Sequence, residues 1–148
     1  MDGDRHMTKS FIRIATETDW PAIESWRAGH FLEMAARMDV PRPVTGQRTL
    51  LDAEWLVLEK DGRPVAAASF TVEDGVCAGH DLYAASGHVL DALALGRALE
   101  GMCDREGWEL RAHTDPENTA YIRILLARGF VPVSIEYKRA PKGRTYGG

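Results

Sequence analysis

Two Asp-Gly dipeptides, Asp61-Gly62 and Asp74-Gly75, separate three stretches of the chain that are rich in apolar residues. This dipeptide is favoured in two-residue β-hairpin turns, because both of its positions tolerate the positive φ angles that these turns require. We therefore predict strands over residues 55–59, 64–72 and 76–84, joined as an antiparallel meander. The middle of the chain is thus expected to form the centre of a sheet.

A strand and a helix are predicted before this meander. Residues 11–15 have the pattern of a short strand, and Thr18 or Asp19 is a suitable N-cap for a helix with Pro21 in its first turn. Apolar residues then recur at roughly helical spacing as far as Met38, and the prolines within 39–43 end the helix. Residues 44–53 are expected to form a loop or a short helix.

A second helix and another strand are predicted after the meander. Leu90, Leu93 and Cys103 belong to a helical apolar pattern that Gly107 is expected to end. Residues 108–113 then suit a strand. Because a strand–helix–strand crossover joins parallel strands, this strand is expected to lie parallel to the one at 76–84.

The segment from residue 115 to 135 reads as a capped helix, a tight stop and a strand. Asp115 is a good N-cap, and Pro116 suits the first helical turn. Gly129 is expected to end the helix. The apolar side chains of this helix recur at Tyr121, Ile124, Leu125 and Leu126, and those of the strand lie at Phe130, Val131, Val133 and Ile135.

The predicted order of elements is β-α-β-β-β-α-β-α-β, which indicates an α/β fold with a mixed central sheet. A chain of 148 residues is expected to fold as a single domain, here over residues 11–139. Residues 1–10 are predicted to be a flexible N-terminal arm, and residues 140–148 a flexible, basic C-terminal tail.

Composition argues against several classes of protein. A formal net charge of −4 does not suit a protein that coats nucleic acid. No apolar run approaches the ~20 residues of a membrane span, and the polar first residues do not resemble a signal peptide, so a cytoplasmic location is expected. Cys77 and Cys103 are expected to be reduced and buried. No metal site is expected, because neither has a Cys or His neighbour at ligand spacing.

The last helix and strand, together with the order of the elements, resemble the GCN5-related N-acetyltransferase (GNAT) family. In that family an Asn opens the helix and a Gly-Phe pair follows eleven residues later, a spacing that Asn118 and Gly129-Phe130 reproduce. The resemblance covers residues 11–139. It implies a GNAT-like fold, acetyl-CoA as the acyl donor, an amine of a small molecule or peptide as the acceptor, and a homodimer or larger assembly.

The resemblance also implies where acetyl-CoA binds. The backbone at Leu82, Tyr83 and Ala84 corresponds to the strand end that holds the pantetheine arm. The loop that holds the pyrophosphate at the next helix N-terminus corresponds to Ser86, Gly87 and His88, and Asn118 belongs to the same cofactor site.

The pyrophosphate motif of the family is degenerate in this chain. The two later glycine positions fall near Leu90 and Ala92, and Asp91 places a negative charge in the first helical turn, where it would oppose a pyrophosphate. An ordinary Ser-Gly helix entry explains the segment equally well.

The tyrosine that commonly protonates the CoA thiolate in this family is also displaced. It stands four residues before the Gly of Gly-Phe, and that position here is Leu125. Tyr121 lies one helical turn earlier, about 5.4 Å along the axis. Tyr121 is kept as the candidate proton donor or cofactor contact, and the alternative is a packed tyrosine whose hydroxyl lies at the surface.

His80 and Asp81 are the candidate bases that remove the proton of the acceptor amine. A Gly-His-Asp sequence is unusual in an otherwise apolar strand. Strict alternation places His80 on one face with Leu82, and Asp81 on the other face with Tyr83. The alternative is the polar, solvated face of an edge strand.

Two functions follow from these patterns. The first is a GNAT-like acyltransferase that moves an acetyl group from acetyl-CoA to an amine. The alternative is a non-catalytic GNAT-fold structural or accessory protein, for example a component of a bacteriophage particle, that binds partners through its terminal arms and is found in the virion. A V-shaped gap between the strands at 76–84 and 108–113 is expected for a CoA site, and a continuous sheet is expected without one.

Overall fold

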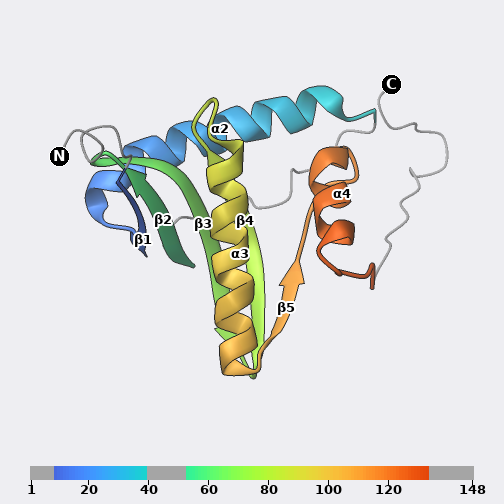
Figure 1. Cartoon of the computed structure of the whole chain (residues 1–148). Helices are drawn as coiled ribbons and strands as arrows, with labels where there is room; N and C mark the ends of the chain where they lie inside the picture. Colours follow the sequence, from blue (N-terminus) through green and yellow to red (C-terminus); the bar gives the residue numbers. More distant parts are fainter. Residues whose placement is uncertain (1–8, 40–52, 134–148) are drawn as a thin grey trace.

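The computed structural model describes residues 9–39 and 53–133, which form one sheet with helices packed against it (Figure 1). The elements in chain order are β1 (Ser10–Ile14), the 3-10 turn η1 (Glu17–Asp19), α2 (Trp20–Arg37), β2 (Glu54–Lys60), β3 (Arg63–Glu73), β4 (Val76–Ala84), α3 (Val89–Glu106), β5 (Glu109–Ala112) and α4 (Thr119–Ala127). The sheet order is β1-β2-β3-β4-β5. The first four strands pair antiparallel, and β5 pairs parallel to β4, which confirms the predicted α/β fold with a mixed sheet.

Both Asp-Gly turns have the hairpin geometry that the sequence predicts. The φ angles are 50° and 80° at Asp61 and Gly62, and 51° and 77° at Asp74 and Gly75. Positive φ at both central positions is the mark of a type I′ turn, whose twist matches that of the flanking strands. These turns join β2 to β3 and β3 to β4, and the predicted meander is confirmed.

The sheet buries a different helix on each face. Leu58 and Ala66 pack with Leu95 of α3, whereas Val57 packs with Ile23 of α2. Neighbouring residues of β2 thus point to opposite helices, as the two-residue period of a strand requires. The core therefore has three layers, with α2 on one side of the sheet and α3 on the other. No helix in the described part of the chain is both long and apolar enough to cross a bilayer.

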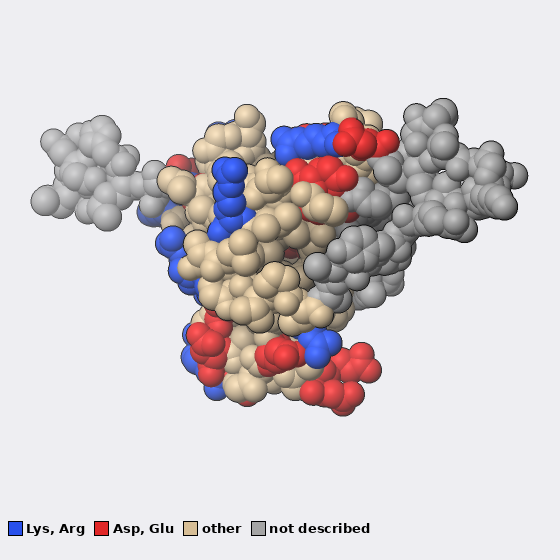
Figure 2. Space-filling model, turned by 90° about the vertical axis from the view of Figure 1, so that its right-hand side faces the viewer, with Lys and Arg blue, Asp and Glu red and all other residues tan. Residues whose placement is uncertain are grey.

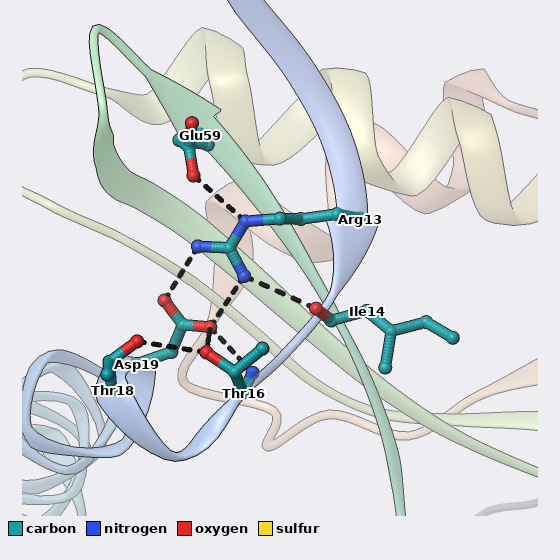
Figure 3. Close-up of polar contacts among 6 residues, drawn as sticks. All are labelled: Arg13, Ile14, Thr16, Thr18, Asp19 and Glu59. Atoms are coloured by element: carbon teal, nitrogen blue, oxygen red, sulfur yellow. Dashed lines mark hydrogen bonds and ion pairs between the residues drawn. The ribbon is translucent and has the colours of Figure 1, made fainter.

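A polar cluster joins β1 to the start of α2 (Figure 3). Arg13 donates to both carboxylate oxygens of Asp19, at 2.7 and 2.9 Å, and to Oε1 of Glu59 on β2 at 2.9 Å. Asp19 also accepts the backbone N–H of Thr16 at 2.8 Å. The hydrogen bond from Arg13 is the main cause that holds the pKa of Asp19 below its ordinary value. The candidate helix cap thus also anchors the edge strand.

Two cysteines pack between β4 and α3, as predicted for small buried residues. Cys77 and Cys103 are free thiols in the same part of the core. Burial, with Cys103 as the second cause, raises the pKa of Cys77 to about 12.

We expect these thiols to react with Ellman's reagent on the order of 10³-fold more slowly in the native protein than in urea, because the thiolate is the reactive form and is reached only after opening. The measurement is the rate of thionitrobenzoate release with and without denaturant. A Cys103→Ser variant assigns the signal, and fast labelling of the native protein would contradict the buried position.

The C-terminal part of the fold differs from the sequence prediction in two places. The last helix, α4, begins at Thr119 with Asn118 as N-cap, not after Asp115. Residues 115–118 instead form a separate turn, which the N–H of Asn118 closes on the carbonyl of Asp115. The helix ends in a Schellman motif, in which Gly129 donates to Leu126 and Phe130 to Leu125.

The predicted final strand does not begin at residue 130. The backbone N–H of Phe130 is used in the helix cap, where it donates to the carbonyl of Leu125, and residues 130–133 are not in a strand. The rest of that predicted strand, residues 1–8 of the predicted arm at 1–10, the segment 40–52 and the tail at 140–148 lie outside the described residues. Ser10, the last residue of that arm, already belongs to β1.

Candidate functional site

The two parallel strands separate after a short pairing, as expected for a CoA site. Pairing of β4 with β5 runs only from Val76 to Gly79, opposite Glu109 to Ala112. Beyond it, β5 diverges toward α4, and no described strand pairs with residues 80–84 on that side (Figure 1). The C-terminal half of β4 therefore has an open edge inside the fold.

Backbone donors of β4 point toward this open edge. The N–H of Ala85 donates to the carbonyl of Val65 on β3 at 2.8 Å. Because successive residues of an antiparallel strand direct their backbone groups to opposite sides, Ala84 and Leu82 present their N–H groups to the open edge. The edge thus offers two donors to an extended ligand.

A cavity of about 260 Å³ lies between α3, α4 and the separated strands. Its lining is mostly apolar and includes Leu82, Leu93, Ala112, Tyr121 and Leu125. We call this cavity the crevice. Figure 2 looks onto the side that carries α4 and shows mostly uncharged residues across the middle of that face, with charged side chains toward its top and bottom.

Charged and titratable groups border the crevice. Arg97, Arg111 and Arg128 are among its lining residues, and Arg128 is paired with Glu100 at 2.9 Å. Burial, and then the charge of Glu100, raises the pKa of Tyr121. The candidate tyrosine is therefore a half-buried group that lines the crevice, with a pKa raised further above neutral pH.

The loop before α3 leaves backbone donors free at the mouth of the open edge. Gly87 has φ of +83°, a left-handed conformation that glycine adopts without strain. His88 donates its N–H to the carbonyl of Ala85, but among the described residues no hydrogen bond uses the N–H groups of Gly87, Val89 or Leu90. Free N–H groups at a helix N-terminus form a site for an anion.

The negative charge of Asp91 is compensated by two neighbours. Lys60 lies 3.0 Å from one carboxylate oxygen, and Nδ1 of His88 lies 2.7 Å from the other. The hydrogen bond with His88 is the main cause that holds the pKa of Asp91 below its ordinary value. The repulsion expected from the sequence is therefore weakened by Lys60, a residue distant in the chain.

A second cavity, of about 430 Å³, lies between α2 and the end of β4. We call it the groove. From α2 it is lined by Ser25, Trp26, Gly29, His30 and Glu33, and from β4 and the following loop by Leu82, Tyr83, Ala84 and Ser86. Leu82 also lines the crevice, so both cavities border the open edge of β4 at this residue.

A β-bulge changes the predicted arrangement of His80 and Asp81. Ser69 of β3 pairs with Asp81 but Phe70 pairs with Gly79, so His80 is the extra residue. Phe70 packs toward α3, which places Thr71 on the face of α2, and Thr71 Oγ1 lies 2.8 Å from Nε2 of His80. His80 therefore shares the face of Asp81 and not that of Leu82, because a bulge breaks strict alternation.

Asp81 and Tyr83 share a face, as the sequence predicted. Oδ1 of Asp81 accepts the hydroxyl of Tyr83, and Oδ2 accepts the hydroxyl of Ser69, both at 2.7 Å. Burial, and then the charge of Asp81, raises the pKa of Tyr83. The carboxylate thus fixes the ring of Tyr83 against the floor of the groove.

His30 is a site residue that the sequence reasoning missed. It comes from α2, and its ring centroid lies 5.5 Å from that of Tyr83. Burial lowers the pKa of His30, although the charges of Asp115, Glu33 and Asp81 act in the opposite direction. The available signal was a Gly29-His30 pair that interrupts the apolar stripe of the first helix.

The other predicted site residues lie in the loop before α3 and at the start of α4. Ser86 lines the groove, and Gly87 and His88 form the entry to α3. Asn118 caps α4, the helix that supplies Tyr121 to the crevice. The structure therefore groups the predicted residues around one edge of β4, apart from Asn118, which lies at the start of the neighbouring helix.

Neither a family model nor a curated protein sequence matches this chain. Solved structures do resemble it. An aminoglycoside N-acetyltransferase, AAC(6')-Iy in complex with CoA, is 15% identical with a TM-score of 0.59, over 93% of this chain and 97% of that one.

Two bacterial N-acetyltransferases give similar values. The ribosomal-protein-S18-alanine N-acetyltransferase of Escherichia coli is 17% identical with a TM-score of 0.64, over 93% of this chain and 88% of that one. An N-acetyltransferase from Staphylococcus aureus Mu50 is 20% identical with a TM-score of 0.61, over 82% and 83%. The chain therefore has the GNAT fold.

Proposed function

We propose that this protein is an N-acyltransferase that moves an acetyl group from acetyl-CoA to an amine. The GNAT fold supports acyltransferase activity in general. The observation that carries the proposal is the separation of β4 from β5 after Gly79, which opens the crevice beside the free N–H groups before α3. A continuous sheet would leave no room for an extended thioester.

The residues around the open edge fit the parts of acetyl-CoA. The pantetheine arm would lie along the N–H groups of Leu82 and Ala84, in place of the missing strand partner. The pyrophosphate would accept hydrogen bonds from the N–H groups of Gly87, Val89 and Leu90. The mostly apolar lining of the crevice suits the uncharged arm of the ligand.

The groove is the side from which an amine would approach. Its lining reaches Leu82 and Ala84, next to the edge where the thioester would lie. An N–H of that edge would stabilise the negative charge that develops on the thioester oxygen. Tyr121 remains the candidate donor of a proton to the departing thiolate, since it lines the crevice and stays protonated at neutral pH.

The acceptor class is a primary amine of a small molecule or a peptide. Two of the similar structures are named for such acceptors, an aminoglycoside in one case and a ribosomal-protein alanine in the other. A cavity of about 430 Å³ that contains aromatic rings and a carboxylate is suited to an organic ammonium ion.

We expect calorimetry to show micromolar binding of acetyl-CoA and at least a tenfold weaker binding of acetyl-pantetheine, which lacks the pyrophosphate. Each charge-assisted hydrogen bond to the phosphates contributes about 1.5–3 kcal/mol, so the loss of one already accounts for a tenfold change. Equal binding of the two ligands would contradict the pyrophosphate site.

Absence of acetyl-CoA binding at millimolar concentration would overturn the enzyme proposal. The non-catalytic scaffold would then be the better description, and its partners would be sought with the full chain and with chains that lack residues 1–8 or 134–148.

A further inference from the structure

We propose that His30 of α2 is the base that takes a proton from the acceptor amine in the groove. The inference rests on the acetyl transfer proposed above and assigns to it a residue from outside the sheet. The sequence candidates His80 and Asp81 then have structural roles, through their hydrogen bonds to Thr71, Ser69 and Tyr83, and do not exchange protons with the substrate.

The position of His30 is the first argument. It lines the groove together with Tyr83 and Ala84, and Leu82 borders both the groove and the crevice. An amine that approaches the open edge of β4 through the groove would therefore share this cavity with the imidazole ring. The imidazole ring of His30 packs against the ring of Tyr83, with 5.5 Å between the ring centroids.

The hydrogen bonds of the two sequence candidates are the second argument. Both oxygens of Asp81 accept hydroxyls, from Ser69 and from Tyr83. Nε2 of His80 is paired with Thr71 at 2.8 Å. Neither residue is among those described as lining the groove. A base must lie within reach of the amine, and of these three residues only His30 lines the groove.

The charges around His30 are the third argument. Burial lowers the pKa of His30, so the imidazole is neutral at neutral pH and can accept a proton. The nearby negative charges oppose this shift and stabilise the imidazolium once it forms. The charged groups that act on His30 come from three elements. They are Glu33 and Arg37 of α2, Asp81 of β4, and Asp115 of the loop after β5, and Arg27 lies one turn earlier on α2.

The charge of Asp115 also acts on this base. It is a carboxylate only 4% exposed, in the turn between β5 and α4, and its charge is the largest of those that raise the pKa of His30. The charge of a segment distant in the chain thus acts on the imidazole. We assign Asp115 a positioning role, in which it favours the protonated form of His30 during the reaction.

The proposed reaction balances with these groups alone. The ammonium form of the acceptor gives one proton to His30, and its nitrogen lone pair then forms a bond to the acetyl carbon. The carbon–sulfur bond breaks, and the electron pair leaves on the CoA sulfur. The nitrogen loses a second proton, so that one proton ends on the thiolate and one is released from His30 to solvent.

The test compares acetyl transfer by the full-length protein and its His30→Gln variant. The probes are acetyl-CoA with 2-phenylethylamine, a diamine and a peptide with a free N-terminal alanine, and the readout is thiol release across pH. A general base contributes about 10²–10⁴-fold, so we expect kcat to fall at least 10²-fold with little change in the Kd of acetyl-CoA. The wild-type rate should decline only below the ordinary His pKa of about 6.5, and this limb should vanish in the variant.

His113→Gln is the matched control, because His113 is an exposed histidine near the end of β5. It should retain the wild-type rate and pH profile. Imidazole added to a His30→Ala variant should restore part of the rate, which a merely structural role would not produce. Thermal unfolding of each variant separates loss of chemistry from loss of fold.

The outcomes separate this inference from the proposed function. A His30→Gln protein with the wild-type rate and pH profile would overturn the role of His30 and leave the acyltransferase intact. Binding of acetyl-CoA without transfer to any of the three amines would also overturn it, since the groove would then lack a working base. Failure to bind acetyl-CoA at all would overturn the proposed function itself.

Discussion

Replacing Asp19 by alanine is expected to lower the free energy of unfolding by about 3 kcal/mol, a large share of the ~5–15 kcal/mol of a typical domain. The Asp19 side chain is only 2% exposed, and its carboxylate accepts two hydrogen bonds from Arg13 and two from Thr16. The substitution leaves the Arg13 charge without its main partner. Partial exposure of Arg13 keeps the expected loss at the lower end of the range for buried ion pairs.

Urea unfolding of Asp19→Ala and Glu109→Gln measures this effect against a matched control. Glu109 and Arg111 also form a short ion pair, but both side chains are more than half exposed, so its loss should cost about 0.5 kcal/mol or less. One exposed ion pair contributes on the order of 1 kcal/mol or less. If the free energy of unfolding of Asp19→Ala lies within about 1 kcal/mol of the wild-type value, the cluster in Figure 3 does not anchor the edge strand.

The Asp19 carboxylate also makes the free energy of unfolding depend on pH. The pKa of Asp19 is lowered in the folded protein, so its contribution is fully present above the unfolded value of about 3.9. It is lost as the pH falls through the lower, folded value. The difference in unfolding free energy between the wild type and Asp19→Asn should therefore shrink in strongly acidic solution.

Gly87→Glu is expected to weaken acetyl-CoA binding about 30-fold, equivalent to about 2 kcal/mol of repulsion between the new carboxylate and the pyrophosphate. Gly87 lies in the loop whose free N–H groups face the proposed phosphate site. Lys60 and His88 already pair with the negative charge of Asp91 in the first turn of α3, so they are engaged before a charge is added at Gly87.

Gly87→Ala separates charge from backbone strain. The φ of +83° disfavours any side chain at this position, and within the described part of the chain no other residue has an atom within 4 Å of an added Cβ. Alanine should therefore lower stability by about 1 kcal/mol while leaving the affinity for acetyl-CoA within a few-fold of the wild type. Calorimetry measures the affinity of both variants for acetyl-CoA. Equal affinities of Gly87→Glu and Gly87→Ala would show that the pyrophosphate binds elsewhere.

The elements that depend on local signals were predictable from the sequence. The two Asp-Gly turns fixed the meander, since positive φ at two successive positions is a local property. The helix that ends at Gly107 was read from its apolar period and its left-handed C-cap. The start of α4 was placed too early, because Asp115 and Pro116 form an isolated turn that has the same sequence signature as a helix N-terminus.

The candidate site was only partly predictable. The sequence pointed to the end of β4 and to Gly87, because glycine and polar residues stand out in an apolar strand and at a helix entry. It could not place His80, whose face depends on a bulge in the pairing of β4 with β3. Nor could it find His30, since a single histidine on an amphipathic helix gives no indication of the strand it will face.

The sequence by itself determined the meander turns and the order of the elements from β1 to β5, because turns, caps and periodicities act over a few residues. Tertiary structure alone decided where β4 and β5 separate, which residues compensate Asp91, and which charges act on His30. These features depend on contacts between segments distant in the chain, and no local pattern specifies the register or the distance at which such segments meet.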